Sequence, residues 1–419
     1  MNRKVTLLYI SLACVLSMQA QTRQQMGGVY YAYPEGPSAK TGTFGTATYV
    51  MSDSLSVPQG FAPFYISHYG RHGSRWMPKD DRYVWICKHF EDERNLTPLG
   101  LQVKGMLQRV WENAKGNGGK LSKLGALQHQ GIAHRMFERY PQIFAAGNAV
   151  KARSSVVDRC AKSMQAFTSE LHTLQPGLNL DVKTDSADMA WIAYVSPEVK
   201  ALENRTHVQA QVSPRRFLLQ LFKDVSKVDE PLKLMTEMHT VASSIQDVGL
   251  NFSSYPQDIE DGLNALFTDD EFRAIYDANN LRMTINNGTV ATNEDIPARS
   301  AISLWLNIEA DRALQSSKSS ATLRFGHDTA LYRLLSLLFD VNVPPAGARE
   351  DAKLVVLGDE MGKMDRVVPM AANLQMIFYK NAKDSVLVKF MLNERDVMLS
   401  PVGQVIYGTH YYSWNVWKQ

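Results

Sequence analysis

The chain of 419 residues lacks several features that would assign it to a specialised class of protein. It has only three cysteines, so disulfides do not define the fold, and Cys87 with Cys160 would give at most one bridge. Basic and acidic residues nearly balance, 45 against 42, so charge gives no indication of a nucleic-acid partner. No internal repeat is evident. A composition of 45% hydrophobic and 21% charged residues is that of an ordinary soluble globular protein.

A hydrophobic run long enough to span a membrane, about 20 residues, is also missing. The N-terminal apolar run covers only residues 5–16, follows Arg3 and Lys4, and precedes small and polar residues. This order predicts a secretory signal peptide over residues 1–20 rather than a transmembrane anchor. We therefore expect an exported protein, periplasmic or secreted, without a membrane span.

The alternative is a lipoprotein anchored at Cys14. It is disfavoured because Ser11 stands three residues earlier, where a leucine is expected. Removing the signal peptide takes away Arg3 and Lys4 and no acid, which lowers the net charge from +3 to +1.

The length predicts two lobes, or one domain with a large insertion. Residues 21–60 are rich in Gly, Ser, Thr and Pro and are expected to be an extended N-terminal segment. Strand-like apolar runs occur before and after a mostly helical stretch over residues 190–318. The simplest architecture is an α/β catalytic core of residues 61–189 and 319–419, interrupted by a helical cap insertion at 190–318.

Individual elements can be placed within this outline. An apolar run at 61–66 predicts a buried central strand, and Leu124–Tyr140, followed by Pro141, predicts a helix. Further strand-like runs in the C-terminal part cover residues 322–325, 354–357, 374–379 and 386–392.

The most informative stretch is SHYGRHGSRW at residues 67–76, directly after the first strand. The carboxyl ends of strands are where open α/β sheets place their ligands. Arg71 and Arg75 bracket His72 with permanently charged, planar groups that match the oxygens of a phosphate dianion. A neutral His72 nitrogen beside such a phosphate is a competent nucleophile for phosphoryl transfer.

A second strand is followed by a similar arrangement, Gly326-His327-Asp328. We expect the two loops to meet at one edge of the sheet. His327 would hold a phosphate oxygen, and Asp328 would protonate the ester oxygen that leaves. An aspartate has a pKa of about 3.9, so this role requires the pKa to be raised by burial or by the substrate's negative charge. Activity should then favour acid conditions.

Arg71-His72-Gly73-Ser74-Arg75 together with His327-Asp328 resembles the histidine acid phosphatase branch of the histidine phosphatase superfamily. A third family element, an arginine in a helix after the second strand, matches Arg159, whose spacing to Phe167 favours it over Arg153. The resemblance covers most of the chain from about residue 61 on. It implies a phosphoglycerate-mutase-like α/β core with a helical cap above the site.

The resemblance also implies a function: hydrolysis of phosphomonoesters, and inositol phosphates such as phytate in particular, without a metal or cofactor. In that reading His72 attacks and Asp328 protonates the leaving alcohol. The phosphoryl group is held by Arg71, Arg75, Arg159 and His327.

The chain departs from the family pattern at three positions. Met77 stands where proline is usual, which affects the shape of the loop. Ala330 replaces the asparagine common in phytases. The inositol polyphosphate phosphatase group often carries His-Ala-Glu as its donor motif, where this chain has His327-Asp328.

Two other functions compete with hydrolysis. A mutase-like phosphotransferase would typically carry an acid soon after RHG, where this chain has Ser74-Arg75. A non-catalytic phosphate-binding protein would need neither His72 nor Asp328. The sequence gives no indication of the oligomeric state.

Three further groups invite functional interpretations. His68 lies four residues before His72, but a strand does not bring positions i and i+4 to one face as a helix does, and nearby arginines would repel a metal. Lys115–Lys120 is glycine-rich but lacks the ending of a P-loop. Four cap residues would either hold distal phosphates or form a solvated face. These are Arg205, His207, Arg215 and Arg216.

Overall fold

The structure is a computed structural model. It describes residues 22–33, 41–44, 47–50, 57–250, 262–288, 300–314, 319–338, 355–356, 363–398, 405–406 and 411–414. The expected signal peptide and Cys14 lie outside these residues. Among the residues described, no helix combines the length and the apolar character that crossing a bilayer requires.

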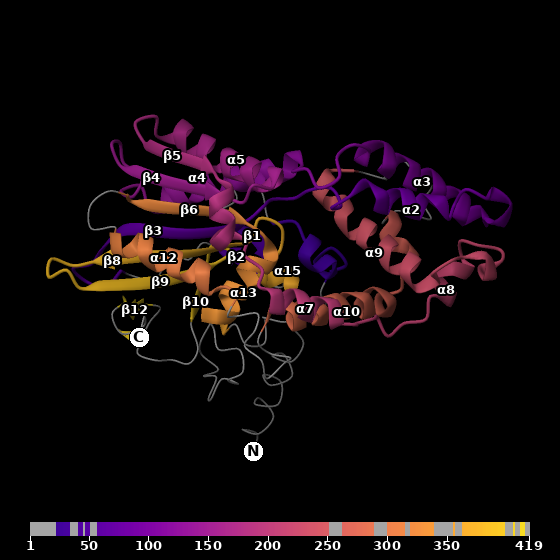
Figure 1. Ribbon diagram of the computed structural model, residues 1–419. Coiled ribbons are helices and arrows are strands. Elements are labelled where there is room, and N and C mark those ends of the chain that lie inside the picture. The colour runs from indigo at the N-terminus through magenta and orange to yellow at the C-terminus, as the bar shows by residue number, and fades with distance from the viewer. Residues whose placement is uncertain are drawn as a thin grey trace, which may run out of the picture.

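One mixed sheet forms the centre of the molecule (Figure 1). Its described strands follow the order β11-β12-β9-β8-β3-β6-β4-β5, with β10 beside β9 and β7 beside β10. Strands β3, β6, β4 and β5 run parallel, whereas β8, β9 and β12 pair antiparallel. The strands are β3 (Ala62–Arg71), β4 (Ala149–Ser154), β5 (Asn179–Thr184), β6 (Ala321–Gly326), β7 (Val355–Val356), β8 (Asn373–Lys380), β9 (Val386–Leu392), β10 (Arg395–Met398), β11 (Val405–Ile406) and β12 (Tyr411–Ser413). A separate hairpin joins β1 (Thr41–Phe44) to β2 (Ala47–Val50).

Helices cover both faces of this sheet, because successive side chains of a strand point to opposite sides. Ile66 of β3 packs in an apolar cluster with α4 and α5, whereas Tyr65 and Tyr69 pack on the other face with α12 and α13. The core helices are α4 (Lys123–Arg139), α5 (Asp158–Leu174), α6 (Met189–Ile192), α12 (Ile302–Leu314), α13 (Asp328–Leu338) and α15 (Met364–Val367). The α/β fold class with flanking helices, predicted from the sequence, is confirmed.

A second group of helices forms a cap beside the sheet (Figure 1). These are α2 (Asp80–Lys88), α3 (Pro98–Ala114), α7 (Pro197–Arg205), α8 (Arg215–Leu219), α9 (Pro231–Val248) and α10 (Asp269–Asn287). Val103, Phe217, Leu234 and Ile275 lie in one apolar cluster that joins α3, α8, α9 and α10. The cap therefore draws α2 and α3 from the segment expected to be core, whereas α12, expected in the cap, packs on the sheet. An apolar helix face predicts burial but not its partner.

Several other predictions can be compared directly. Residues 322–325, 374–379 and 386–392 lie in β6, β8 and β9, and the helix predicted over 124–140 is α4. Of the run 354–357, the two central residues form β7, and the two flanking ones lie outside the described residues.

Two segments differ from expectation. The first strand does not stop at residue 66 but continues to Arg71, so half of the histidine- and arginine-rich stretch is strand. The N-terminal segment is not simply extended, because Gln25–Tyr30 forms the short 3₁₀ helix η1. Four of its residues, 25 to 28, are buried, and Met26 belongs to the apolar cluster of the cap.

Candidate active site

Two loops at the carboxyl ends of β3 and β6 form the candidate active site. These strands are parallel neighbours, and their register pairs Arg71 with Gly326. His72 and His327 each follow directly, and their ring centroids lie 5.8 Å apart with the ring planes nearly perpendicular. The fold thus brings together the two motifs that are far apart in the sequence.

Glycine at two positions allows this close approach. A Cβ added at Gly73 would overlap the backbone of Gly125 at the start of α4, and one at Gly326 would overlap the hydroxyl of Tyr69. A side chain at Gly73 would therefore require the backbone of Gly125 to move, and one at Gly326 would require the ring of Tyr69 to move. We call residues 71–75 the phosphate loop. Its glycine is required for packing against α4.

His72 is buried, and one hydrogen bond orients its ring. Nδ1 lies 2.9 Å from the carbonyl oxygen of Gly73, and because a carbonyl only accepts, Nδ1 is the protonated nitrogen that donates. Nε2 is therefore the nitrogen with a free lone pair. Burial lowers the pKa of His72 well below its usual value, and the charges of Arg71 and Arg75 lower it further. The imidazole stays neutral even in acid, as a nucleophile must.

Arg71 is fully buried and anchors the loop. Its Nη1 donates to the carbonyl oxygens of Val29 and Val368, each at 2.6 Å, and its Nη2 lies 3.0 Å from Oδ2 of Asp328. Its Nε has no hydrogen-bond partner among the residues described. Arg71 therefore orients the carboxyl of Asp328 and keeps one donor for an anion.

Arg75 and Arg159 add positive charge at the same place. Arg75 donates from Nη1 to the carbonyl of Trp76 at 2.8 Å and stacks over the ring of Tyr30, 5.5 Å from its centroid. Arg159 lies in the first turn of α5, and its charge lowers the pKa of both His72 and His327. Within the described part of the chain, the Nε atoms of both arginines have no hydrogen-bond partner. Each keeps a donor for an anion.

Arg153, the residue that the spacing argument rejected, is used elsewhere. Its Nη2 lies 2.6 Å from Oδ2 of Asp181 on the neighbouring strand β5. That contact ties β4 to β5, so Arg153 serves the sheet.

His327 and Asp328 complete the site. Nε2 of His327 lies 3.2 Å from the hydroxyl of Ser155, and burial with the nearby charge of Arg159 lowers its pKa to about 4. Burial alone would raise the pKa of Asp328, but Arg71, Arg75 and His327 outweigh it and hold that pKa below its usual value. Of the two ways of raising this pKa that the sequence left open, burial is outweighed in the free protein. The substrate's own negative charge is the remaining means to raise it.

His68 and the two cysteines Cys87 and Cys160 have no place in the proposed chemistry. His68 is buried between the rings of Phe167 and Phe325, at 5.4 and 5.3 Å, and burial lowers its pKa to about 3. It is therefore a neutral core residue. Cys87 and Cys160 are both free, so the possible bridge between them is absent. Within the described part of the chain, no three His, Cys, Asp or Glu residues are grouped as metal ligands.

The glycine-rich segment Lys115–Lys120 is a turn that supports α2. The amides of Gly116 and Gly118 donate to the two carboxylate oxygens of Asp80 at 2.7 and 2.8 Å. The amide of Gly119 donates to the carbonyl of Met77, next to the phosphate loop, at 2.8 Å. The amides of this segment therefore bond to Asp80 and Met77, next to the phosphate loop, instead of binding a nucleotide.

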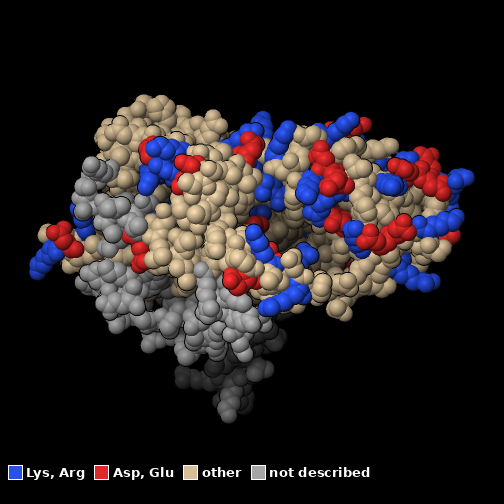
Figure 2. Space-filling model, in the orientation of Figure 1, with Lys and Arg blue, Asp and Glu red and all other residues tan. Residues whose placement is uncertain are grey.

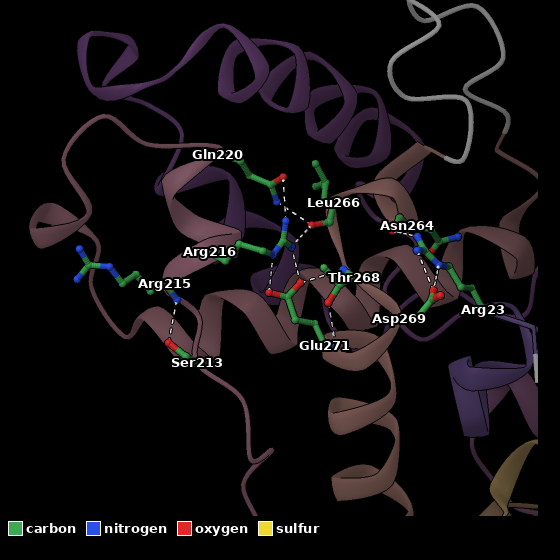
Figure 3. Close-up of polar contacts among 10 residues, drawn as sticks. All are labelled: Arg23, Ser213, Arg215, Arg216, Gln220, Asn264, Leu266, Thr268, Asp269 and Glu271. Atoms are coloured by element: carbon green, nitrogen blue, oxygen red, sulfur yellow. Dashed lines mark hydrogen bonds and ion pairs between the residues drawn. The ribbon is translucent and has the colours of Figure 1, made fainter.

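The four cap residues named in the sequence analysis do not line the two cavities described below. These are Arg205, His207, Arg215 and Arg216. Arg216 donates from Nε to Glu271 at 2.7 Å and from Nη2 to the carbonyl of Leu266 at 2.7 Å, which ties α8 to α10 (Figure 3). The side chain of Arg215 points away from these groups, and its backbone amide donates to the hydroxyl of Ser213 at 3.4 Å (Figure 3). Arg205 and His207 are exposed. Arg216 is thus a structural residue rather than a ligand for distal phosphates.

A cavity of about 310 Å³ adjoins Asp328, and its walls come from both cap and core. A second cavity of about 260 Å³ shares Arg82, Thr240, Asn279 and Arg282 with it. Figure 2 shows the surface hollowed between the two lobes, with Lys and Arg side chains at the border. The sequence analysis did not identify Arg82, Arg282 or Tyr30 as wall residues, because each stands in a segment without a motif.

Comparison with known proteins gives a consistent result. No family model matches the chain. It is 23% identical over 306 residues to "Multiple inositol polyphosphate phosphatase 1" of Gallus gallus, in an alignment that covers 68% of this chain and 66% of that protein.

Two solved structures share the fold. The multiple inositol polyphosphate phosphatase of Bifidobacterium longum, in complex with inositol hexasulfate, superposes with a TM-score of 0.66 at 16% identity, covering 93% of this chain and 96% of that one. The phytase from D. castellii gives a TM-score of 0.63 at 13% identity, covering 94% and 84%. At these identities the structural likeness concerns the fold.

Proposed function

We propose that the protein hydrolyses phosphomonoesters through a phosphohistidine at His72, as its resemblance to the histidine acid phosphatases and its likeness to the relatives above suggest. One observation carries this proposal. Nδ1 of His72 donates to the carbonyl of Gly73, so Nε2 is a neutral, unprotonated nitrogen beside Arg71, Arg75 and Arg159. A nucleophile within a cluster of arginines is the arrangement that phosphoryl transfer requires.

The first step forms the phosphohistidine. Nε2 of His72 attacks phosphorus, the bond from phosphorus to the ester oxygen breaks, and that oxygen takes a proton from Asp328 and leaves as an alcohol. The arginines and His327 stabilise the charge on the phosphoryl oxygens. The substrate brings this proton as the phosphate monoanion. Once the phosphate lies between Arg71 and Arg75, its negative charge offsets the charges that lower the pKa of Asp328, and the proton passes to this carboxyl.

The second step returns the free enzyme. A water molecule gives its proton to the carboxylate of Asp328 and attacks phosphorus. The bond between nitrogen and phosphorus breaks, its electron pair returns to Nε2 of His72, and inorganic phosphate leaves. Asp328 thus acts as acid and then as base.

Inositol polyphosphates are the substrate class that we propose for this cavity, on the basis of the charges in its walls. The carboxylates in its walls are paired: Asp328 with Arg71, and Glu203 with Arg333 at 3.0 Å. In the second cavity Glu237 is paired with Arg82. Arg282 bonds Asn279 at 2.9 Å but has no carboxylate partner in the part of the chain that the structure describes. Its charge is left for an anionic group of the substrate beyond the phosphate being cleaved. The names of the relatives point to the same substrate class.

Replacing Arg282 should therefore affect substrate selection. We expect Arg282→Ala to lower kcat/KM for phytate about 10- to 100-fold, since a hydrogen bond to a charged group contributes about 1.5–3 kcal/mol. A small aryl phosphate does not reach α10, and its kcat/KM should stay within about twofold. Steady-state kinetics on both substrates measure this. Arg215→Ala is the matched control, because that arginine does not line either cavity. Equal losses on both substrates would show that Arg282 does not select for distal phosphates.

The direct test of the function is release of inorganic phosphate from phytate and from an aryl phosphate between pH 4 and pH 7. Hydrolysis of both supports the proposal. Transfer of phosphate between inositol phosphates instead of to water would identify a mutase-like enzyme. Saturable phosphate binding without turnover would identify a binding protein.

We also propose that the protein is exported, on the basis of the charged and apolar pattern of residues 1–20. The expected result is a mature protein outside the cytoplasm whose N-terminus, read by mass spectrometry, begins near residue 21. A lipid-modified Cys14 would identify the lipoprotein instead. An unprocessed chain that stays in the cytoplasm would contradict export.

A further inference from the structure

Ser74, at the centre of the phosphate loop, is held by side chains from two other parts of the fold. Its amide donates to Oε1 of Gln128 at 2.9 Å, and its hydroxyl donates to Oδ1 of Asp247 at 2.5 Å while accepting from Nε2 of Gln128 at 3.0 Å. Its carbonyl accepts from the amide and the hydroxyl of Ser122, at 2.8 and 3.0 Å. All four residues are buried. The path of the loop between His72 and Arg75 is therefore fixed by these bonds.

Asp247 is the one of these partners that comes from the cap. It lies in the last turn of α9 and is fully buried. The same helix packs into the apolar cluster of the cap through Leu234 and Met238, and its Thr240 lines both cavities. One rigid helix thus contacts the wall of the substrate cavity and, through Asp247, the phosphate loop.

We propose that Asp247 is a positioning residue: it fixes the phosphate loop to the cap helix α9 through Ser74, and so holds His72 and Arg75 in place relative to a substrate bound under the cap. The inference deepens the proposed function and rests on it. Positioning at this accuracy matters, because a misplacement of about 1 Å can cost a factor of about 10² in rate.

The electrostatic environment of Asp247 indicates which form makes this contact. Its charged and titratable neighbours are Arg71 of β3, Arg75 of the loop and Tyr83 of α2. Burial raises the pKa of Asp247 to about 8, although the hydrogen bond from Ser74 and the two arginines act in the opposite direction. Below that pH the carboxyl is neutral and leaves both arginines to the phosphate. An ionised Asp247 would compete with the phosphate for them.

The experiment compares Asp247→Ala, Ser74→Ala, the double variant and Asp247→Asn. Each alanine variant should lose about 10- to 100-fold in kcat on phytate and on an aryl phosphate. The double variant should be no worse than Ser74→Ala, because Ser74→Ala already removes the contact to Asp247 together with the one from Gln128. Asp247→Asn keeps an oxygen that accepts from Ser74, so it should stay within about threefold of wild type at pH 5. Above pH 8 it should keep more of its activity than wild type.

A control and an independent readout complete the design. Ser244→Ala changes another buried polar residue of α9, whose hydroxyl donates to the carbonyl of Val241 in the same helix, and should leave kcat unchanged. Binding of inorganic phosphate, measured by calorimetry, should weaken in Asp247→Ala and persist in Asp247→Asn. If the wild-type protein binds phosphate but hydrolyses neither ester, the proposed function fails while this readout still tests the positioning role. Wild-type kcat in Asp247→Ala, or equal losses in Asp247→Ala and Asp247→Asn, would overturn the inference.

Discussion

His72→Ala should abolish phosphate release from phytate and from a small aryl phosphate alike, with a loss in kcat on the order of 10⁴-fold or more. Without the imidazole no covalent intermediate forms, and the remaining arginines bind phosphate without transferring it. The loss should be similar for both substrates, because both esters depend on the same attack by Nε2, whatever other contacts they make with the cap. Phosphate release under saturating substrate measures the effect.

A trapping experiment identifies the intermediate itself. Wild-type protein quenched during turnover of labelled substrate should carry phosphate on a histidine, in a linkage that is labile to acid, and His72→Ala should carry none. His134→Ala is a suitable control. That histidine lies in α4 and pairs with Glu170 of α5, and it is not among the residues of the proposed site. Wild-type activity in His72→Ala would mean that the arginines around it serve another reaction.

Asp328→Asn should give the second large effect, one that depends on the leaving group. An amide cannot supply the proton, so kcat/KM for phytate, whose inositol alkoxide is a poor leaving group, should fall about 10²- to 10⁴-fold. For an aryl phosphate with an acidic phenol, the ester oxygen leaves without a proton, and kcat/KM should fall less than about tenfold. Measuring kcat/KM restricts the comparison to the first irreversible step.

The pH dependence follows from the direction of the pKa shift at Asp328. In the free protein Arg71 and Arg75 keep this carboxyl ionised well into the acid range, so the proton must arrive with the substrate. A phosphate monoester loses its second proton near pH 6. We therefore expect kcat/KM for phytate to fall as pH rises above about 6, and the aryl phosphate to show a weaker fall. His72 stays neutral over this range and should not limit the acid side.

Two further measurements distinguish loss of the acid from loss of structure in Asp328→Asn. The substitution also weakens the contact to Arg71, so the affinity for inorganic phosphate and the thermal melting temperature should be measured in parallel. Retained phosphate binding with a loss specific to phytate supports the acid role. An equal loss on both esters would assign Asp328 a purely structural role through Arg71.

Local sequence was sufficient to predict the elements that carry the site. The apolar runs that became β3 and β6 are buried on both faces, so they read as continuous hydrophobic segments, and polar residues after them fall at the carboxyl edge. The end of β3 was placed too early because its last residues, Ser67 to Arg71, are polar or small, although they pair with β6 and β8. Hydrogen bonding to both neighbouring strands therefore extends β3 beyond its apolar run.

Groups without a motif could not be found in this way. Asp247 and Arg282 stand in helices whose sequences resemble any amphipathic surface helix, and the N-terminal residues around Tyr30 have a composition typical of a loop. Their proximity to the site arises from packing between segments far apart in the chain. The division between core and cap was misplaced for the same reason, since α2 and α3 show an apolar face but not its partner.

The sequence by itself was sufficient to predict the groups on which the proposed chemistry rests: a candidate nucleophile, an acid and the arginines near them. They could be predicted because polar residues that follow a buried apolar run fall at the carboxyl edge of the sheet. Only the tertiary structure decided the charge state of these groups and which residues line the cavity. Arg71, at the end of β3, contacts Asp328, which follows β6. Burial raises the pKa of Asp328, but the charges of Arg71, Arg75 and His327 together outweigh burial and lower it. Electrostatic interaction depends on distance in space. Distances between segments remote in the chain exist only once it has folded.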